Sequence, residues 1–122
     1  MILFQRDIVL PQILPFNFGD DQINLHDAVS ATCTVTKGDL PLDIWWMLSE
    51  IDSPSEQKLS TNDGLGITRA GNKLSVLNIE SVKGRHRGNY TCYARNKAGT
   101  VQFSTQLAIN GDSISKYLSN DP

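Results

Sequence analysis

Alternation of apolar and polar residues is the main pattern along this chain, and it predicts strands. Between residues 29 and 35, apolar side chains occupy every second position, and hydroxyl side chains occupy the positions between them. Successive side chains of a strand point to opposite faces, so this period indicates a strand with one buried side. No longer stretch keeps the helical period of about 3.6 residues. Comparable alternating stretches, bounded by turn residues, lie at 42–48, 66–69, 73–79, 89–95 and 101–109.

The alternation also assigns the side chains of each strand to the core or to the surface. Those expected to point inward are Val29, Ala31, Cys33, Val35, Leu42, Ile44, Trp46, Leu48, Leu74, Val76, Ile79, Tyr90, Cys92, Ala94, Val101, Phe103, Thr105, Leu107 and Ile109. In the stretch 73–79 this choice turns Ser75 outward and leaves Leu77 exposed. Short antiparallel strands of this kind usually pack as two sheets about 10 Å apart. The predicted fold class is therefore all-β, with two antiparallel sheets.

Two segments are expected to lie at the edges of these sheets. Prolines flank the short stretch 11–15, and they favour an edge strand because proline cannot donate to a central ladder. The polar stretch 49–66 is interpreted as a long connection or an irregular edge strand, because it is rich in turn-forming residues.

The composition fits one ordinary globular domain and excludes several function classes. The chain has 122 residues, 39% of them hydrophobic, and a formal net charge of −2. Without a basic field, binding to nucleic acid or to an anionic membrane surface is not expected. No apolar run approaches the roughly 18 residues that span a membrane, so direct membrane insertion is not expected either.

Few residues suggest chemistry. The two histidines lack zinc-finger spacing relative to the two cysteines, so we expect no metal site and no other cofactor. The chain lacks a nucleophile elbow, a phosphate loop and paired carboxylates, so we expect no enzymatic activity. Cys33 and Cys92 then form either one disulfide or two free thiols. Asn89-Tyr90-Thr91 is a sequon, which favours N-glycosylation of Asn89 in a secreted or surface protein.

Four residues together resemble the signature of an immunoglobulin domain. Cys33 and Cys92 lie on inward positions, Trp46 lies inward on the strand after the first cysteine, and Tyr90 lies two residues before the second. The resemblance implies an I-set immunoglobulin-like β-sandwich with a Cys33–Cys92 disulfide between the sheets, a packed Trp46 and a tyrosine corner at Tyr90. In the chain-entropy model such a disulfide stabilises by about 4 kcal/mol.

Local strings narrow the resemblance. Pro15-Phe16, Phe18-Gly19, the run 37–41 and the run 85–92 are similar to the Dscam family of cell-adhesion receptors. The similarity is to the seventh immunoglobulin domain of arthropod members and to the first domain of the short chelicerate members. The resemblance implies an extracellular part of a plasma-membrane protein. It also implies isoform-specific binding to an identical copy on an opposing cell, weak for an isolated domain, with neighbouring immunoglobulin domains as further partners.

The expected organisation is one domain with two short ends. Residues 10–110 are expected to form the I-set domain. We expect residues 1–9 to be a flexible N-terminal segment or residues added for expression, and residues 111–122 to be a C-terminal tail or linker.

Two surfaces are candidates for binding. In the Dscam family this domain pairs through the sheet of its first, second, fourth and fifth strands, in an antiparallel two-fold arrangement. The residues that this resemblance assigns to the homophilic interface are Ser30, Thr32, Thr34, Arg69, Lys73, Ser75 and Leu77. The outward residues Trp45, Met47, Tyr93 and Arg95 form an alternative interface, suited to a heterophilic immune or guidance receptor. A further alternative is a cytosolic structural I-set module with free thiols.

Overall fold

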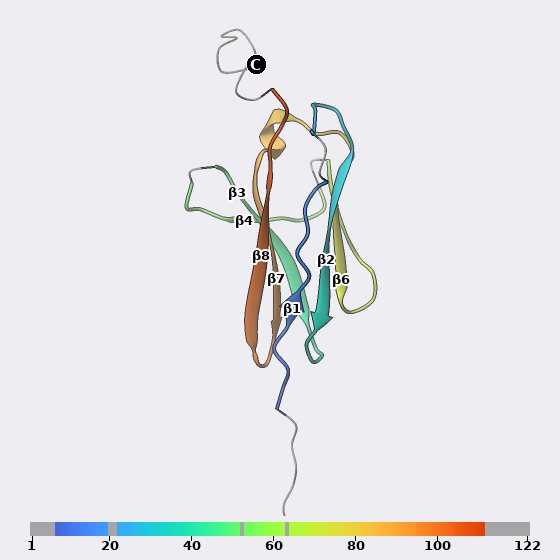
Figure 1. Cartoon of the computed structure of the whole chain (residues 1–122), viewed down its shortest axis with the longest axis vertical. Helices are drawn as coiled ribbons and strands as arrows, with labels where there is room; N and C mark the ends of the chain where they lie inside the picture. Colours follow the sequence, from blue (N-terminus) through green and yellow to red (C-terminus); the bar gives the residue numbers. More distant parts are fainter. Residues whose placement is uncertain (1–6, 20–21, 52, 63, 112–122) are drawn as a thin grey trace, which may run out of the picture.

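The computed structural model describes residues 7–19, 22–51, 53–62 and 64–111 (Figure 1). Within these residues the chain forms strands and one short 3-10 helix, η1 (Gly84–His86), so the all-β prediction is confirmed. The strands are β1 (Gln12–Ile13), β2 (Val29–Lys37), β3 (Asp43–Ser49), β4 (Gln57–Lys58), β5 (Leu65–Arg69), β6 (Leu74–Ile79), β7 (Gly88–Asn96) and β8 (Gly99–Leu107).

The strands form two antiparallel sheets that pack face to face. One sheet has the order β1-β2-β6-β5 and the other has the order β4-β3-β7-β8. Figure 1 shows β8 and β7 on one side of the sandwich and β2 and β6 on the other. The edge strands expected near residues 11–15 and within 49–66 are the two-residue strands β1 and β4.

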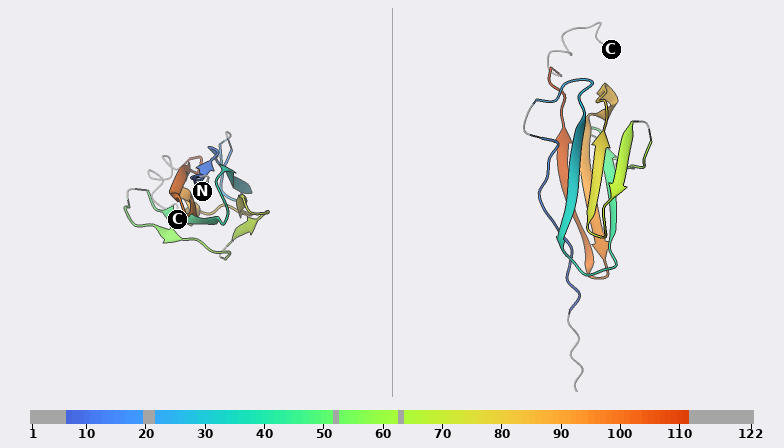
Figure 2. Two further views of the ribbon diagram at one scale, coloured as in Figure 1. Left: turned by 90° about the horizontal axis from the view of Figure 1, so that it is seen from below. Right: turned by 90° about the vertical axis from the view of Figure 1, so that its right-hand side faces the viewer.

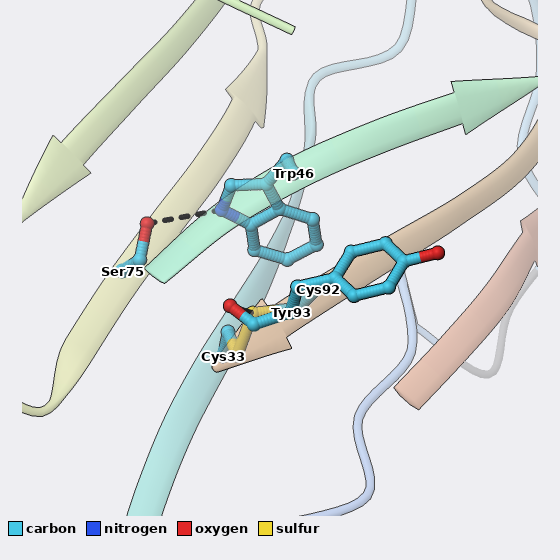
Figure 3. The surroundings of a disulfide bond; sticks show 5 residues. All are labelled: Cys33, Trp46, Ser75, Cys92 and Tyr93. Carbon is cyan, nitrogen blue, oxygen red and sulfur yellow. Dashed lines mark hydrogen bonds between the residues drawn. A yellow bond between two sulfur atoms is a disulfide. The ribbon is translucent and has the colours of Figure 1, made fainter. Parts of the chain in front are cut away.

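The disulfide between Cys33 and Cys92 joins the two sheets at their centre. Cys33 lies on β2 and Cys92 on β7, and the two Cα atoms are 6.3 Å apart. Both cysteines are fully buried, and Trp46 of β3, 1% exposed, packs beside them (Figure 3). The expected disulfide is confirmed. The described cysteines include no free thiol.

The sequence-based orientation of β6 was wrong. Ser75 is 1% exposed and Leu77 is 0% exposed, so both point into the core, whereas Leu74 and Val76 are only half-buried. Apolar residues occupy both faces of this strand, so alternation alone did not decide which face is buried. With Leu77 and Ile79 inside, Ser75 must also be inside. Its hydroxyl is satisfied there, because Trp46 Nε1 donates a hydrogen bond of 2.9 Å to Ser75 Oγ (Figure 3).

One asparagine joins three segments: the start of the domain, the turn after β2 and the end of β7. Asn96, at the end of β7, donates through its side-chain amide to the carbonyl oxygens of Val9 (2.7 Å) and Asp39 (3.0 Å). The backbone N–H of Val9 in turn donates to an Asp39 carboxylate oxygen at 2.7 Å. Val9 is therefore held against the domain, one residue before the expected boundary at residue 10. Most of the expected terminal segments, 1–6 and 112–122, lie outside the described residues.

We expect Ser75→Ala to destabilise the domain by about 1–3 kcal/mol, because the buried indole N–H of Trp46 then has no acceptor. Urea unfolding followed by tryptophan fluorescence measures this change. Ser30→Ala is the matched control, since Ser30 is an exposed serine on the neighbouring strand, and its effect should stay within about 0.5 kcal/mol. Equal losses for the two variants would contradict a structural role for the Trp46–Ser75 bond.

Candidate interaction surfaces

The outer surface of the β1-β2-β6-β5 sheet carries small uncharged side chains, and we call it the hydroxyl face. The strand register places outward residues of β2 opposite those of β6 in three pairs: Ser30 with Asn78, Thr32 with Val76, and Thr34 with Leu74. Thr68 of β5 continues the row of Thr32 and Val76 on the other side of β6. The right-hand view of Figure 2 looks onto these strands. The hydroxyl face consists of Ser30, Thr32, Thr34, Thr68, Leu74, Val76 and Asn78.

The structure keeps part of the predicted homophilic set and corrects the rest. Ser30, Thr32 and Thr34 point outward as expected. Arg69 and Lys73 are exposed at the end of the sheet, but the register places both on the side of their strands that faces the opposite sheet, because Arg69 is opposite Ser75 and the Lys73 carbonyl pairs with Val35. Arg69 donates a hydrogen bond of 2.8 Å to the carbonyl oxygen of Asn72. Ser75 and Leu77 do not belong to this surface, because they are buried against the opposite sheet.

The outward residues of β6 differ from those expected from the sequence. Leu74, Val76 and Asn78 take the places that had been given to Ser75 and Leu77. The one signal that could have found them is Ile79, which the pattern had placed inside: strict alternation back from Ile79 buries residues 77 and 75.

The predicted alternative surface, which we call the aromatic face, lies on the other sheet. The rings of Trp45 and Tyr93 stack with centroids 5.3 Å apart and planes 4° apart. The guanidinium of Arg95 lies 5.2 Å from the centre of the Trp45 ring. Met47 follows on β3, opposite Thr91. Trp45, Met47, Tyr93 and Arg95 therefore share one side of the sheet, as the alternation predicted.

Two carboxylates fix the aromatic face. Asp43 forms an ion pair of 3.2 Å with Arg95. Glu56, from the connection between β3 and β4, accepts a hydrogen bond of 2.7 Å from the Tyr93 hydroxyl. This hydrogen bond holds the phenol proton and raises the pKa of Tyr93. Part of the 49–66 connection thus lies against this face, and Trp45 and Tyr93 are half-buried.

The predicted glycosylation site lies on the same sheet as the aromatic face. Asn89 is half-buried on β7, between Ser49 of β3 and Gln106 of β8. Thr91, the third residue of the sequon, is 4% exposed, and its hydroxyl lies 2.6 Å from the hydroxyl of Ser104. A glycan on Asn89 remains a prediction.

The tyrosine corner is present at the end of the sandwich near η1. The Tyr90 side chain is fully buried, and its hydroxyl donates a hydrogen bond of 2.5 Å to the carbonyl oxygen of His86. His86 is itself buried, and its Nδ1 accepts a hydrogen bond of 2.8 Å from the backbone N–H of Lys83. Burial raises the pKa of the Tyr90 hydroxyl. These contacts fix the connection between β6 and β7.

Comparison with known proteins decides the family. A family model described as an immunoglobulin domain matches residues 11–96. Over 84% of its length the chain is 41% identical to the cell adhesion molecule Dscam1 of Drosophila melanogaster, covering 5% of that protein. The crystal structure of the Dscam1 Ig7 domain, isoform 9, aligns with a TM-score of 0.72 and 40% identity, covering 83% of this chain and 100% of that one.

This chain is an immunoglobulin domain of the Dscam family. It is also 35% identical to the human cell adhesion molecule DSCAM, over 83% of this chain and 5% of that protein. The chain thus spans about 5% of the length of these curated relatives. The family is one of cell-adhesion receptors, which supports a binding module rather than an enzyme.

No helix in the described part of the chain is long and apolar enough to cross a membrane. Nor do three or more His, Cys, Asp or Glu side chains gather there in a group that could hold a metal ion.

We expect the stability that the Tyr90 hydroxyl contributes to decline above about pH 10. Its pKa in the folded chain is raised above the ordinary value of 10.0, so at high pH the phenol of the unfolded chain ionises first, which favours unfolding. The difference in unfolding free energy between the wild-type chain and Tyr90→Phe should narrow there, by up to about 1.4 kcal/mol per pH unit. Urea titrations from about pH 7 to 11.5 measure this difference in unfolding free energy. A difference that stays constant over the whole range would contradict a raised pKa of Tyr90 in the folded chain.

Proposed function

We propose that this domain serves homophilic, isoform-specific adhesion as an extracellular part of a plasma-membrane Dscam-type receptor. The hydroxyl face of one copy pairs with the same face of a second copy on an opposing cell, in an antiparallel two-fold arrangement. The observation that carries the proposal is the row Thr32, Val76 and Thr68, which crosses the middle of the face without a charge. The similarity to the Dscam1 Ig7 domain supports it.

The symmetry of such a contact explains why an uncharged row is important. In a two-fold contact between sheet faces, the axis lies between the two sheets and crosses the strands. Each residue at the axis then meets its own copy, and like charges there are costly. Threonine and valine avoid this repulsion, and the apolar part of Val76 favours burial.

One sheet face makes a small interface. Specific protein interfaces bury about 800 Å² per partner, and smaller ones are weak and transient. A pair of isolated domains is therefore expected to associate weakly. Adhesion between cells then depends on many receptors acting together and on neighbouring immunoglobulin domains of the parent receptor, which raise the effective concentration.

We expect Val76→Asp to weaken self-association by at least about tenfold, because two carboxylates then face each other near the axis. Analytical ultracentrifugation at high protein concentration measures the dissociation constant. Bead aggregation, in which each bead displays many copies, detects weaker pairing.

Two controls make this experiment decisive. Gln102→Asp introduces the same charge at an exposed position on the outer surface of β8, and it should leave self-association unchanged. Trp45→Ser, on the aromatic face, should also leave it unchanged. Loss of pairing in Trp45→Ser but not in Val76→Asp would overturn the choice of face.

We expect expression in a eukaryotic secretory pathway to place an N-glycan on Asn89. Treatment with a peptide N-glycosidase should then lower the apparent mass of the wild-type chain and leave Asn89→Gln unchanged. An unglycosylated wild-type chain would contradict this prediction. The glycan would stand on the β4-β3-β7-β8 sheet and leave the hydroxyl face free for pairing.

The aromatic face supports a second candidate function, heterophilic binding by an immune or guidance receptor. Its specific support is the Trp45–Tyr93 stack beside Arg95, since tryptophan, tyrosine and arginine dominate interface hot spots. The further alternative, a cytosolic structural module, has less support, because disulfides such as Cys33–Cys92 persist mainly in oxidising compartments.

A further inference from the structure

The predicted glycosylation site and the aromatic face share one outer surface of the β4-β3-β7-β8 sheet. Successive outward side chains of a strand occur at every second position, so Asn89, Thr91 and Tyr93 of β7 lie on the same side. Tyr93 follows Asn89 by four positions, which corresponds to about 13 Å along a strand. A few linked pyranose rings of an N-glycan cover such a distance.

The row of residues between Asn89 and Tyr93 forms a continuous floor. Met47 of β3 and Ser104 of β8 flank Thr91 in this row. Thr91 is 4% exposed although it points outward, so neighbouring side chains close over it. Met47 is half-buried, and the rest of its thioether side chain is open to a ligand. A sugar chain that runs from Asn89 toward Tyr93 therefore meets side chains along its whole length.

The chemistry of this surface suits a carbohydrate. Gln106, Ser104 and Gln102 of β8 lie beside the three rows in turn, and their side chains are exposed. Amides and hydroxyls both donate and accept hydrogen bonds, as the hydroxyls of a sugar do. The Trp45–Tyr93 stack adds aromatic rings, whose negative faces attract the C–H groups of a pyranose ring. The surface thus offers hydrogen-bonding and aromatic groups along one line.

In the other direction from Asn89, the described chain leaves the sheet. Strand β7 begins at Gly88, and the 3-10 helix η1 lies just before it. The side chain of Arg87, between η1 and β7, turns to the helix, where its Nε donates a hydrogen bond of 2.9 Å to the carbonyl oxygen of Gly84. The stacked rings lie on the Tyr93 side, so a glycan on Asn89 gains more contact by running in that direction.

We propose that the N-glycan of Asn89 lies along the sheet and covers the aromatic face. Its first sugars contact Met47, and the following sugars reach the part of the Trp45–Tyr93 stack that the protein leaves exposed. The occupant of this face is then a carbohydrate of the same chain, which removes apolar surface from water and closes the face to protein partners. The inference rests on the glycosylation of Asn89 proposed above and does not depend on self-pairing.

Methyl NMR spectroscopy tests the proposal. The chain has 2 methionines, so the domain produced in eukaryotic cells with methyl-labelled methionine gives a signal that can be assigned to Met47. The glycosylated domain should show nuclear Overhauser contacts between this methyl group and sugar protons. Ring currents of the Trp45–Tyr93 stack should displace the signals of sugar protons beside it. Trimming the glycan to its first N-acetylglucosamine with an endoglycosidase should abolish this displacement.

A relocated glycan is the matched control. Glu80→Thr completes a sequon at the exposed Asn78, on the hydroxyl face, and Asn89→Gln removes the original sequon. A glycan on this opposite sheet should give no contact with Met47 and no displacement by the aromatic rings. Mass spectrometry verifies that the new site is occupied, and near-ultraviolet circular dichroism checks that the variant is folded.

The outcomes separate the covering of the aromatic face from glycosylation itself. If mass spectrometry finds no glycan on the wild-type chain, the proposed modification fails and this inference fails with it. If Asn89 carries a glycan whose protons contact neither Met47 nor the aromatic stack, the inference is overturned while glycosylation stands. Either result leaves the homophilic function to be judged by its own experiment, which concerns the other sheet.

Discussion

The hydrogen bond from the Trp46 indole to Ser75 links the core of this domain to the strand orientation on which the hydroxyl face depends. Trp46 belongs to β3 and Ser75 to β6, so the bond spans the two sheets beside the disulfide. It gives a polar side chain on β6 a satisfied place in the core. With Ser75 inside, Leu77 and Ile79 are also inside, and Val76 is on the surface. Because β6 turns Ser75 inward to accept this bond, the alternating residues Leu74, Val76 and Asn78 point outward and belong to the hydroxyl face.

Sequence reasoning succeeded where only one side of a strand could be buried. On β2 and β3 the inward positions carry apolar residues or cysteine, so alternation placed Cys33 and Trp46 in the core, and the resemblance to immunoglobulin domains implied the disulfide. It failed on β6, where leucine, valine and isoleucine occupy both sides. Strict alternation back from Ile79 was the one signal within the strand for the correct side. The contact that makes a buried Ser75 favourable, its acceptance of the Trp46 indole N–H, lies on another strand and is not contained in that alternation. The shared outward side of Trp45 and Tyr93 was predicted correctly from alternation on each strand, and the two residues are cross-strand partners.

The two outer surfaces differ in whether their polar and charged side chains already have hydrogen-bond or ion-pair partners within the domain. On the aromatic face Arg95 is paired with Asp43, and Tyr93 is paired with Glu56. A partner that binds there must compete with these contacts or build around them. The residues that define the hydroxyl face carry no charge. Pairing through the hydroxyl face does not compete with contacts such as Arg95–Asp43 and Tyr93–Glu56, which is why we favour this face for pairing with a second copy.

The bonds of Asn96 have a mechanical consequence for an adhesion domain. In the proposed adhesion role, tension on the receptor chain would enter this domain through the residues before Val9. Because Asn96 holds the carbonyls of Val9 and Asp39, the load passes at once to the end of β7 and to the turn after β2 (Figure 1). The short edge strand β1 is thereby shielded from being peeled off its neighbour. A single amide side chain thus directs tension toward the strands that the disulfide joins.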